Sequence, residues 1–171
     1  MTIEIRPLAD TDIAAALVIQ TASYPSFLIE DDAAFASRIA FSPNHSLAAV
    51  QSGRLAGYVL AHSWVTRSPP AIGTTLDPNV ATDGTLFIHD LAVAGFARGT
   101  GLARRLVDHV MALASRHGMT SAELIAVEGA ARFWHGMGFA EDDQPDLAGK
   151  VAAYGDAARY MVRPIPPGSA D

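Results

Sequence analysis

The stretch ARGTGLARR, residues 97–105, combines residue types that suit the binding of a phosphate group. Gly99 and Gly101 have no Cβ, so the backbone there can approach an anion closely. The stretch precedes a segment with helical spacing, and a helix N-terminus offers free N–H groups and a positive dipole end. Arg98 and Arg104 add positive charge. These features predict a phosphate site; the alternative is that the two glycines only turn the chain into a helix.

Two common phosphate-binding motifs do not fit this stretch. A Walker-type loop ends in Gly-Lys-Ser/Thr, which brings a lysine to the phosphates and a hydroxyl to magnesium, and this ending is missing. A dinucleotide-binding loop has a third small residue for close packing of helix on strand, but Arg104 stands at that position. No series of parallel strand–helix units follows either. A dinucleotide-dependent oxidoreductase is therefore a weak alternative, and we expect no NAD binding.

The segment Arg98–Ala103 matches the pattern R/Q-x-x-G-x-G/A, and in this the chain resembles the GNAT superfamily of acetyltransferases, which binds acetyl-CoA at such a loop. A strand ending in LAV precedes the loop and a long amphipathic helix follows it, as in that family. ARFWHGMGF, residues 131–139, is similar to the family's later helix and Gly-Phe segment. The resemblance implies transfer of the acetyl group of acetyl-CoA to a primary amine of a small molecule or peptide. The amine would attack directly in a ternary complex.

The resemblance also implies which residues bind the cofactor. In the family, the strand before the loop separates from its neighbour, and the pantetheine arm of CoA hydrogen-bonds the strand's backbone in the gap. A backbone N–H at this point can also polarise the thioester carbonyl. The expected cofactor-binding residues are Leu91, Ala92, Val93, Arg98, Gly99, Thr100, Gly101, Leu102, Ala103, Arg104 and Trp134. No metal ion is expected in this site.

A base is needed because an alkylamine has a pKa near ~10 and is mostly protonated at neutral pH. His89 stands two residues before Leu91, so strand alternation predicts that it shares the face of Leu91 and Val93, with Asp90 on the opposite face. Some amine acetyltransferases of the family carry a working histidine here. We predict His89 as the base; the alternative is a histidine packed against the sheet. Asp90 is expected to be a structural partner, and Glu128 a solvated loop residue or a proton relay.

The sequence departs from the family pattern at Trp134. Many members have a tyrosine there that protonates the departing thiolate, and an indole N–H is no proton donor of that kind. The asparagine that often begins this segment is also missing, with Val127 near its place. Either the thiolate leaves without an enzymic acid, or another tyrosine serves. Tyr154 is the candidate, and the alternative for it is a packed hairpin aromatic. Trp134 itself is expected to be a core residue beside the CoA arm.

The acceptor substrate is expected to contact Tyr24, Glu30 and Trp64, since the family binds acceptors between the early helices, the strand meander and the final hairpin. Phe27 and His62 fall in the same segments. An aromatic and acidic lining would suit an amine cation. The simpler alternative is that Trp64 and Phe27 are core residues, and that Glu30 and the two aspartates after it cap a helix.

Composition limits the remaining function classes. The chain has 171 residues, half of them apolar and 18% charged, which is typical of a globular domain. A net charge of −6 argues against a nucleic-acid binder. With no cysteine, disulfides, thiolate metal sites and a cysteine nucleophile are excluded. The first residues do not resemble a signal peptide and no apolar run is long enough for a membrane span, so we expect a cytoplasmic protein.

Hydrophobic periodicity predicts the elements that position these residues. Strands are expected at 2–6, 47–50, 55–65, 86–93 and 121–127, a final strand pair between Phe139 and Arg163, and helices at about 10–21, 33–40, 102–117 and 130–136. The connection at 66–84 is long, and such loops are often functional or mobile. The order predicts an α/β (α+β) fold with a GNAT-type mixed sheet of about six to seven strands and helices on both faces. Residues 1–163 are expected to form one domain, followed by a flexible tail at 164–171.

A second function class remains open at this point. The chain can also be a non-catalytic acyl-CoA-binding regulatory module that kept the cofactor loop and lost turnover. The missing tyrosine favours this alternative, whereas the intact loop and His89 favour the enzyme. Homodimers are common among members of the family, so a homodimer is an expectation for this chain.

Overall fold

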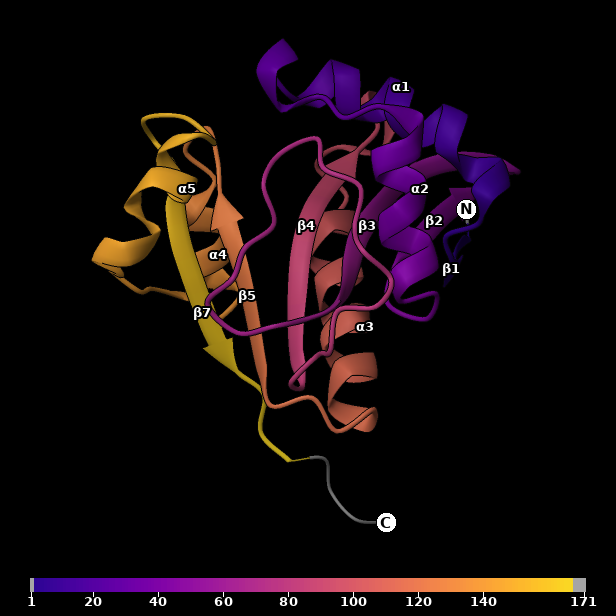
Figure 1. Cartoon of the computed structure of the whole chain (residues 1–171). Helices are drawn as coiled ribbons and strands as arrows, with labels where there is room; N and C mark the ends of the chain where they lie inside the picture. The colour runs from indigo at the N-terminus through magenta and orange to yellow at the C-terminus, as the bar shows by residue number, and fades with distance from the viewer. Residues whose placement is uncertain (1, 168–171) are drawn as a thin grey trace.

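The strands form one mixed sheet in a computed structural model that describes residues 2–167 (Figure 1). Within these residues the sheet has seven strands in the order β1-β2-β3-β4-β5-β7-β6. Neighbouring strands are antiparallel except β4 and β5, which are parallel. The strands are β1 Ile3–Pro7, β2 Leu47–Gln51, β3 Arg54–Trp64, β4 Thr85–Val93, β5 Ser121–Ala126, β6 Ala140–Glu141 and β7 Arg159–Pro164. The predicted mixed sheet is thereby confirmed.

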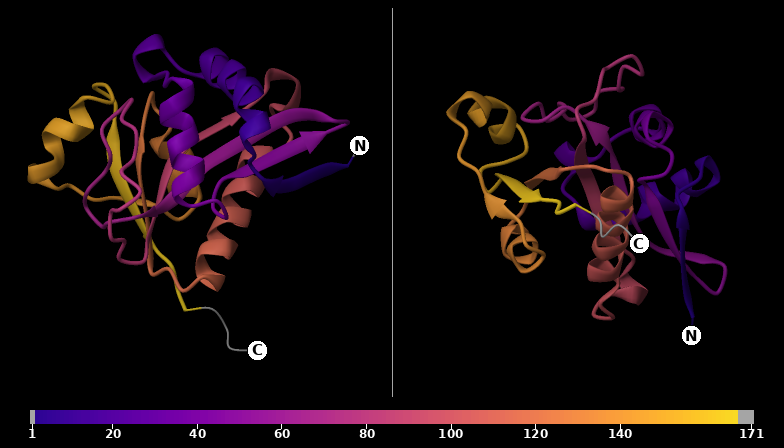
Figure 2. Two further views of the ribbon diagram at one scale, coloured as in Figure 1. Left: turned by 45° about the vertical axis from the view of Figure 1, so that its right-hand side comes forward. Right: turned by 90° about the horizontal axis from the view of Figure 1, so that it is seen from below.

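Helices cover both faces of this sheet, as predicted (Figure 2). They are α1 Ile13–Ser23, α2 Asp32–Phe41, α3 Leu102–Arg116, α4 Ala131–Gly136 and α5 Ala148–Ala152. Helices α1 and α2 pack on one face, and α3 and α4 pack on the other. Asp31 caps α2 by accepting a hydrogen bond from the Ala34 N–H at 2.8 Å. Gly118, with φ of 75°, follows the end of α3.

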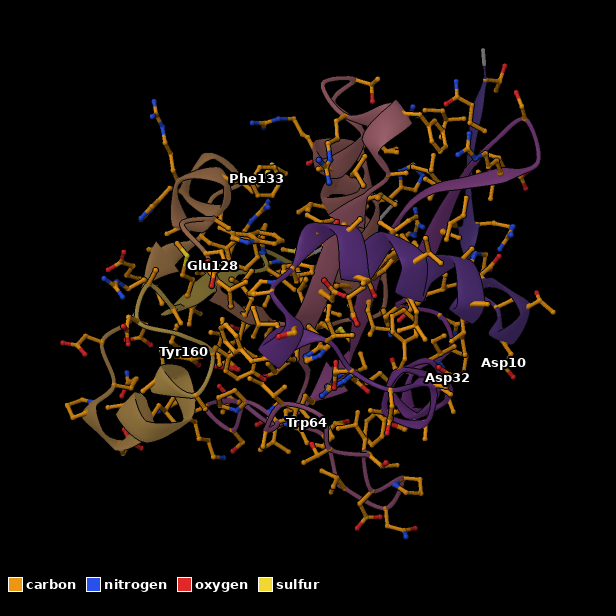
Figure 3. All side chains as sticks on the ribbon, turned by 90° about the horizontal axis from the view of Figure 1, so that it is seen from above. Asp10, Asp32, Trp64, Glu128, Phe133 and Tyr160 are labelled. Atoms are coloured by element: carbon orange, nitrogen blue, oxygen red, sulfur yellow. The ribbon has the colours of Figure 1, made fainter. Side chains whose placement is uncertain are left out.

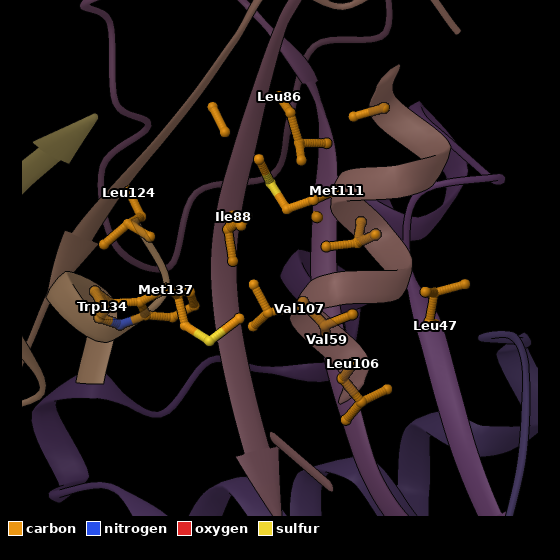
Figure 4. Close-up of a cluster of buried hydrophobic side chains, with 14 of the residues drawn as sticks. Leu47, Val59, Leu86, Ile88, Leu106, Val107, Met111, Leu124, Trp134 and Met137 are labelled. Atoms are coloured by element: carbon orange, nitrogen blue, oxygen red, sulfur yellow. The ribbon is translucent and has the colours of Figure 1, made fainter. Parts of the chain in front are cut away.

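The larger core lies between α3 and the sheet (Figure 4). The apolar positions of α3 recur with helical spacing, and Leu106, Val107 and Val110 are fully buried. They belong to one buried cluster with strand residues such as Val59, Leu86 and Leu124. This packing holds the helix start, and with it the glycine-containing turn, against the carboxyl end of β4.

Strands β4 and β5 are hydrogen-bonded over only part of their length. The pairing runs from Thr85 opposite Ser121 to Ile88 opposite Leu124 and then stops, although β4 continues to Val93. Figure 1 shows the two ribbons separating toward their carboxyl ends. Among residues 2–167, the backbone groups on this edge of β4 beyond Ile88 therefore have no strand partner, which is the condition for an extended ligand to pair with them.

A β-bulge in β4 changes the face of the sheet toward which the side chain of His89, the predicted base, points. Leu60 pairs with Asp90 whereas Ala61 pairs with Ile88, so His89 is an extra residue in the ladder. His89 consequently contacts Glu30, on the side of α1 and α2, and Asp90 is bonded on that side too. The expectation that His89 shares a face with Leu91 and Val93, opposite Asp90, was wrong, because simple alternation does not hold across a bulge.

Two chain segments near the C-terminus differ from the sequence prediction. The connection between β6 and β7 contains α5, which the sequence analysis did not foresee. At the start of the expected tail, β7 includes Pro164 and the Ile165 N–H donates to the Thr120 carbonyl at 2.9 Å, so the sheet extends past residue 163. Residues 168–171 of that tail lie outside the described residues. Between residues 2 and 167, the helices are all too short or too polar to cross a membrane.

Candidate active site

A cleft of about 380 Å³ opens where β4 and β5 separate. Residues 88–93 of β4 form one wall, and Leu124 and Ile125 of β5 form the other. Val127 and Glu128, in the turn after β5, extend the second wall. The cleft thus lies in the gap that the interrupted strand pairing leaves, and it joins the unpaired edge of β4 to the start of α3.

The turn before α3 has the backbone of an anion-binding loop. Gly99 has φ of 75° and Gly101 has φ of 80°, conformations that L-residues adopt only with strain. A Cβ placed on either glycine would meet no protein atom within 4 Å, so the space in front of the turn is open. Since α3 begins at Leu102, the N–H groups of its first turn have no intrahelical acceptor and are available to an anion.

The predicted cofactor-binding residues gather around this cleft and turn. Six of them line the cleft: Leu91, Ala92, Val93, Arg98, Ala103 and Trp134. Gly99, Thr100, Gly101 and Arg104 are exposed on the adjacent turn and the first turn of α3. Leu102 is different, because its side chain is buried in the core under Gly57, so only its backbone faces the site. These positions fit a bound CoA: an open glycine cradle for the pyrophosphate and an unpaired strand edge for the arm.

The opposite end of the cleft is lined by residues from distant parts of the chain. Gln20 and Tyr24 come from the first helix region, Leu28 from the turn after it, and Ile72 from the 66–84 loop. The Tyr24 hydroxyl donates to the Leu91 carbonyl at 2.6 Å, which ties this end to β4. Burial and the nearby Asp90 carboxylate raise the pKa of Tyr24 well above its usual range, so this hydroxyl stays protonated.

Tyr154 also reaches the cleft. It is buried to 6% exposure in the connection between β6 and β7, and its hydroxyl donates to the Pro70 carbonyl at 2.7 Å. This contact fastens the 66–84 loop beside the cleft. Burial raises the pKa of Tyr154 to about 12, so the phenol keeps its proton at neutral pH. Trp134, by contrast, packs against Phe133 and Phe139 in the core while touching the cleft.

His89 is hydrogen-bonded through Nε2 to Oε1 of Glu30. Glu30 is almost fully buried, and its other oxygen accepts from Arg38 at 3.3 Å and from the Gly73 N–H at 3.1 Å. His89 itself lines the cleft. The expected base therefore lies at the cleft, held by a carboxylate that the sequence analysis assigned to the acceptor.

Burial and the Arg38 guanidinium set the charges of Glu30, His89 and His62. Burial opposes ionisation of Glu30, but His89, Arg38 and the Gly73 N–H outweigh it and lower the pKa of Glu30 to about 2. Burial and the Arg38 guanidinium lower the pKa of His89, against the raising effect of Glu30. Burial and Arg38 also lower the pKa of His62 to about 3. The cluster thus holds an ionised carboxylate, a guanidinium and two neutral imidazoles at neutral pH.

Two predicted acceptor contacts do not lie at the cleft. Trp64 is packed with Leu76 and Phe87, and its indole N–H donates to the Ser68 carbonyl at 2.7 Å. Figure 3 shows Trp64 well apart from Glu128 and Phe133, which line the cleft. Glu30 contacts the cleft residue His89 but does not line the cleft itself. Both side chains are turned into the protein because apolar and ionic partners from other elements cover them.

Several residues at this end were missed by sequence reasoning. Arg38 is completely buried in α2, and nothing in its local sequence distinguishes it from an exposed helix arginine. Gln20 accepts from the Glu30 N–H at 3.0 Å and donates to Asp90 at 2.8 Å, and Tyr58 also donates to Asp90. Ile72 was part of a loop without a recognisable pattern. Their roles depend on contacts across 8 to 70 residues of sequence, which no local signal reports.

Comparison with known proteins agrees with this geometry. Residues 14–139 match the sequence profile of the Acetyltransferase (GNAT) family. The search of curated proteins found no match to this chain. Similar solved structures include Ard1 from Thermoplasma volcanium, with a TM-score of 0.74 at 18% identity, covering 97% of this chain and 99% of that one.

Two further structures contain CoA or a CoA derivative. Naa50 from Arabidopsis thaliana, in complex with the bisubstrate analogue CoA-Ac-MVNAL, has a TM-score of 0.67 at 18% identity and covers 95% of this chain and 97% of its own. The PaiA N-acetyltransferase from Thermoplasma acidophilum, in complex with coenzyme A, has a TM-score of 0.66 at 13% identity and covers 96% of this chain and 99% of its own. At such identities these likenesses show the fold alone. The family profile spans most of the sequence, including the glycine turn and the separating strands, and the chain belongs to the GNAT family of acetyltransferases.

Proposed function

We propose that this chain is an acetyl-CoA-dependent N-acetyltransferase that acetylates a primary amine of a small molecule or peptide. The observation that carries the proposal is the cleft that joins the unpaired edge of β4, the glycine turn and His89. The family and the CoA complexes of Naa50 and PaiA support the choice of cofactor. The bisubstrate analogue on Naa50 includes a peptide, which supports keeping peptides among the acceptors.

The cofactor side of the cleft binds and orients acetyl-CoA. When bound, acetyl-CoA supplies an activated acyl group as a thioester. The N–H groups around Gly99–Ala103 would hold the pyrophosphate, with Arg98 and Arg104 adding charge. The backbone of Leu91–Val93 would hold the pantetheine arm along the unpaired edge of β4, and a backbone N–H there would polarise the thioester carbonyl.

The acceptor side moves the proton. His89, neutral at physiological pH, takes a proton from the acceptor amine so that the amine nitrogen can attack. Tyr24 and Tyr154 border the place where the amine would lie, and Tyr154 is the candidate donor for the departing thiolate. For that donation the Tyr154 hydroxyl must release the Pro70 carbonyl. Glu30 and Trp64 are not assigned contacts with the acceptor.

One observation favours the alternative of a non-catalytic acyl-CoA-binding module. Among the residues that line the cleft, Trp134 replaces the usual tyrosine, and the hydroxyls of Tyr24 and Tyr154 are already bound to backbone carbonyls. A domain with this arrangement would bind the cofactor and turn it over slowly or not at all.

The experiment that separates the two is thiol release from acetyl-CoA with a panel of amines and short peptides, with CoA binding measured in parallel by calorimetry. The proposed enzyme releases thiol in step with acetylated product for at least one acceptor. Micromolar CoA binding without turnover across a broad panel would reject the enzyme and support the regulatory module.

A further inference from the structure

A buried cluster of charged and titratable side chains includes the candidate base, and binding of the cofactor does not explain it. Its three members come from different elements: Glu30 from the α1–α2 connection, Arg38 from α2, and His89 from β4. The side chains are 1%, 0% and 6% exposed respectively. Burying an ion pair costs several kcal/mol of desolvation for each ion, so a cluster of this kind is weak evidence for stability alone.

The Glu30 carboxylate is fixed at both oxygens and through its backbone. Oε1 contacts His89 Nε2, and Oε2 accepts from Arg38 Nη2 and from the Gly73 N–H. The backbone N–H of Glu30 donates to Gln20, whose side chain is anchored on Asp90. These contacts leave the carboxylate one orientation, the one that faces His89.

This orientation determines which nitrogen of His89 carries hydrogen. An ionised carboxylate can only accept, so the hydrogen lies on Nε2 and the lone pair lies on Nδ1. Nδ1 is buried and has no hydrogen-bond partner within residues 2–167. Because His89 lines the cleft, this unpartnered nitrogen is the basic ring atom left for a ligand that enters there. Nδ1 is itself buried, so the imidazole must shift slightly for an acceptor amine to reach it.

The other charged or titratable groups around His89 are engaged elsewhere. Arg38 donates to Nε2 of His62 at 3.1 Å, and the Nδ1–H of His62 donates to the Ser63 carbonyl at 3.0 Å. Asp90, next to His89 on β4, is bonded to Gln20 and Tyr58. Tyr154, from the β6–β7 connection, is bonded to Pro70. Glu30 is thus the group that determines which ring nitrogen of His89 carries the hydrogen.

We propose that Glu30 is a positioning residue for the proposed acetyl transfer, which holds the hydrogen on His89 Nε2 and presents Nδ1 as the atom that deprotonates the acceptor amine. In that step an N–H bond of the ammonium breaks, its electron pair stays on the amine nitrogen, and a new N–H bond forms at Nδ1. The resulting imidazolium is balanced by the Glu30 carboxylate. This role rests on the proposed function and adds to it.

The test compares Glu30→Gln with the double variant Glu30→Gln/Arg38→Met. The single variant keeps the size of the side chain and removes its charge, which leaves Arg38 without a counter-charge and can prevent folding. The double variant removes both charges, so no unpaired charge is buried and the effect of losing Glu30 can still be measured in a folded protein. Asp146→Asn is the matched control, because it removes one carboxylate from the exposed pair with Arg67.

Two readouts are measured for each variant. The first is the pH profile of kcat/KM, for which Glu30→Gln should lower the pKa of the acid limb by roughly one unit and reduce kcat about tenfold or more. A merely structural role predicts that the double variant regains wild-type kcat once its stability returns. A positioning role predicts that kcat stays low in a folded double variant, and that Asp146→Asn is unchanged.

The second readout needs no turnover. In protein labelled with 15N-histidine, the imidazole shifts of His89, assigned from a His89→Asn spectrum, should report hydrogen on Nε2 in the wild type and a mixture of tautomers in both variants. If this pattern appears while no amine is acetylated, the positioning of His89 holds and the proposed reaction fails. Hydrogen on Nδ1 in the wild type, or wild-type kcat and pH profile in a folded double variant, would overturn the proposal.

Discussion

The two ends of the cleft are lined by different kinds of groups: mainly backbone at one end and side chains at the other. The cofactor end consists of backbone: a glycine turn, the start of α3 and an unpaired strand edge, all within residues 88–104. The acceptor end consists of side chains from the first helices, the 66–84 loop, β4 and the β6–β7 connection. The first depends on local conformation and the second on long-range packing. A substitution at one end should therefore leave the binding or chemistry at the other end largely unchanged. The variants below test whether the two ends are independent in this way.

The largest effect is expected from Gly101→Asp. Gly101 has φ of 80°, and the new carboxylate would lie against the pyrophosphate, so we expect CoA affinity to fall at least a thousandfold, about 4 kcal/mol. Calorimetric titration with CoA checks this. Gly53→Asp is the matched control, because Gly53 has φ of 73° in the β2–β3 turn and equally open surroundings. Equal affinities for the two variants would show that the turn does not bind CoA.

A smaller effect, confined to the chemistry, is expected from His89→Ala. Loss of the base should reduce kcat/KM about a hundredfold and remove the acid limb of its pH profile, while CoA affinity stays within about twofold. Steady-state thiol release is measured from about pH 5 to about pH 9, at intervals of roughly half a pH unit. His109→Ala, an exposed histidine of α3, serves as control. An unaltered pH–rate profile in His89→Ala would leave His89 a packed residue only.

Tyr154→Phe should have a still smaller effect on turnover. It removes the phenolic proton and the hydrogen bond to Pro70, so we expect kcat to fall about tenfold, with about 1 kcal/mol lost from the free energy of unfolding. Thiol release and urea denaturation measure the two effects. Loss of stability with unchanged kcat would make Tyr154 an anchor for the 66–84 loop and no acid.

Part of the pH dependence of stability should come from His62, beside the acceptor end of the cleft. The pKa of His62 is lowered to about 3 by burial and Arg38, whereas the unfolded side chain titrates near 6.5. The unfolded state then binds the extra proton first, so the free energy of unfolding falls as pH drops below 6.5 toward 3. We expect His62→Gln to reduce this loss between pH 7 and 4 by about 1 kcal/mol. Urea denaturation checks it, and an equal slope in His62→Gln would contradict it.

The sequence predicted the local geometry around the glycine turn better than the placement of the side chains at the other end of the cleft, and the reason is physical. Gly99, Gly101 and the spacing of Leu106, Val107 and Val110 are local signals, since each is explained by neighbours within a few turns. The resemblance to the family added the strand gap, which the pairing of β4 and β5 confirms. The sheet and most of its elements followed in the same way from hydrophobic periodicity.

The acceptor end could not be predicted in this way. A bulge inserts His89 into β4, and its position is set by the register against Leu60 and Ala61, not by the strand's own sequence. Arg38 and Glu30 look like residues of an exposed helix and its cap until α2 packs on the sheet. Trp64 looks like a binding aromatic until Phe87 and Leu76 cover it. Each of these depends on tertiary contacts that carry no local pattern.

The most direct test of the account is a crystal structure of the wild-type protein with acetyl-CoA. We expect the pyrophosphate within hydrogen-bond distance of the N–H groups of residues 99–103, and the pantetheine arm paired with β4 along Leu91–Val93. We also expect the acyl group at the end of the cleft near His89 and Tyr24. Cofactor bound away from the β4–β5 gap, or a pyrophosphate that does not contact the glycine turn, would contradict it.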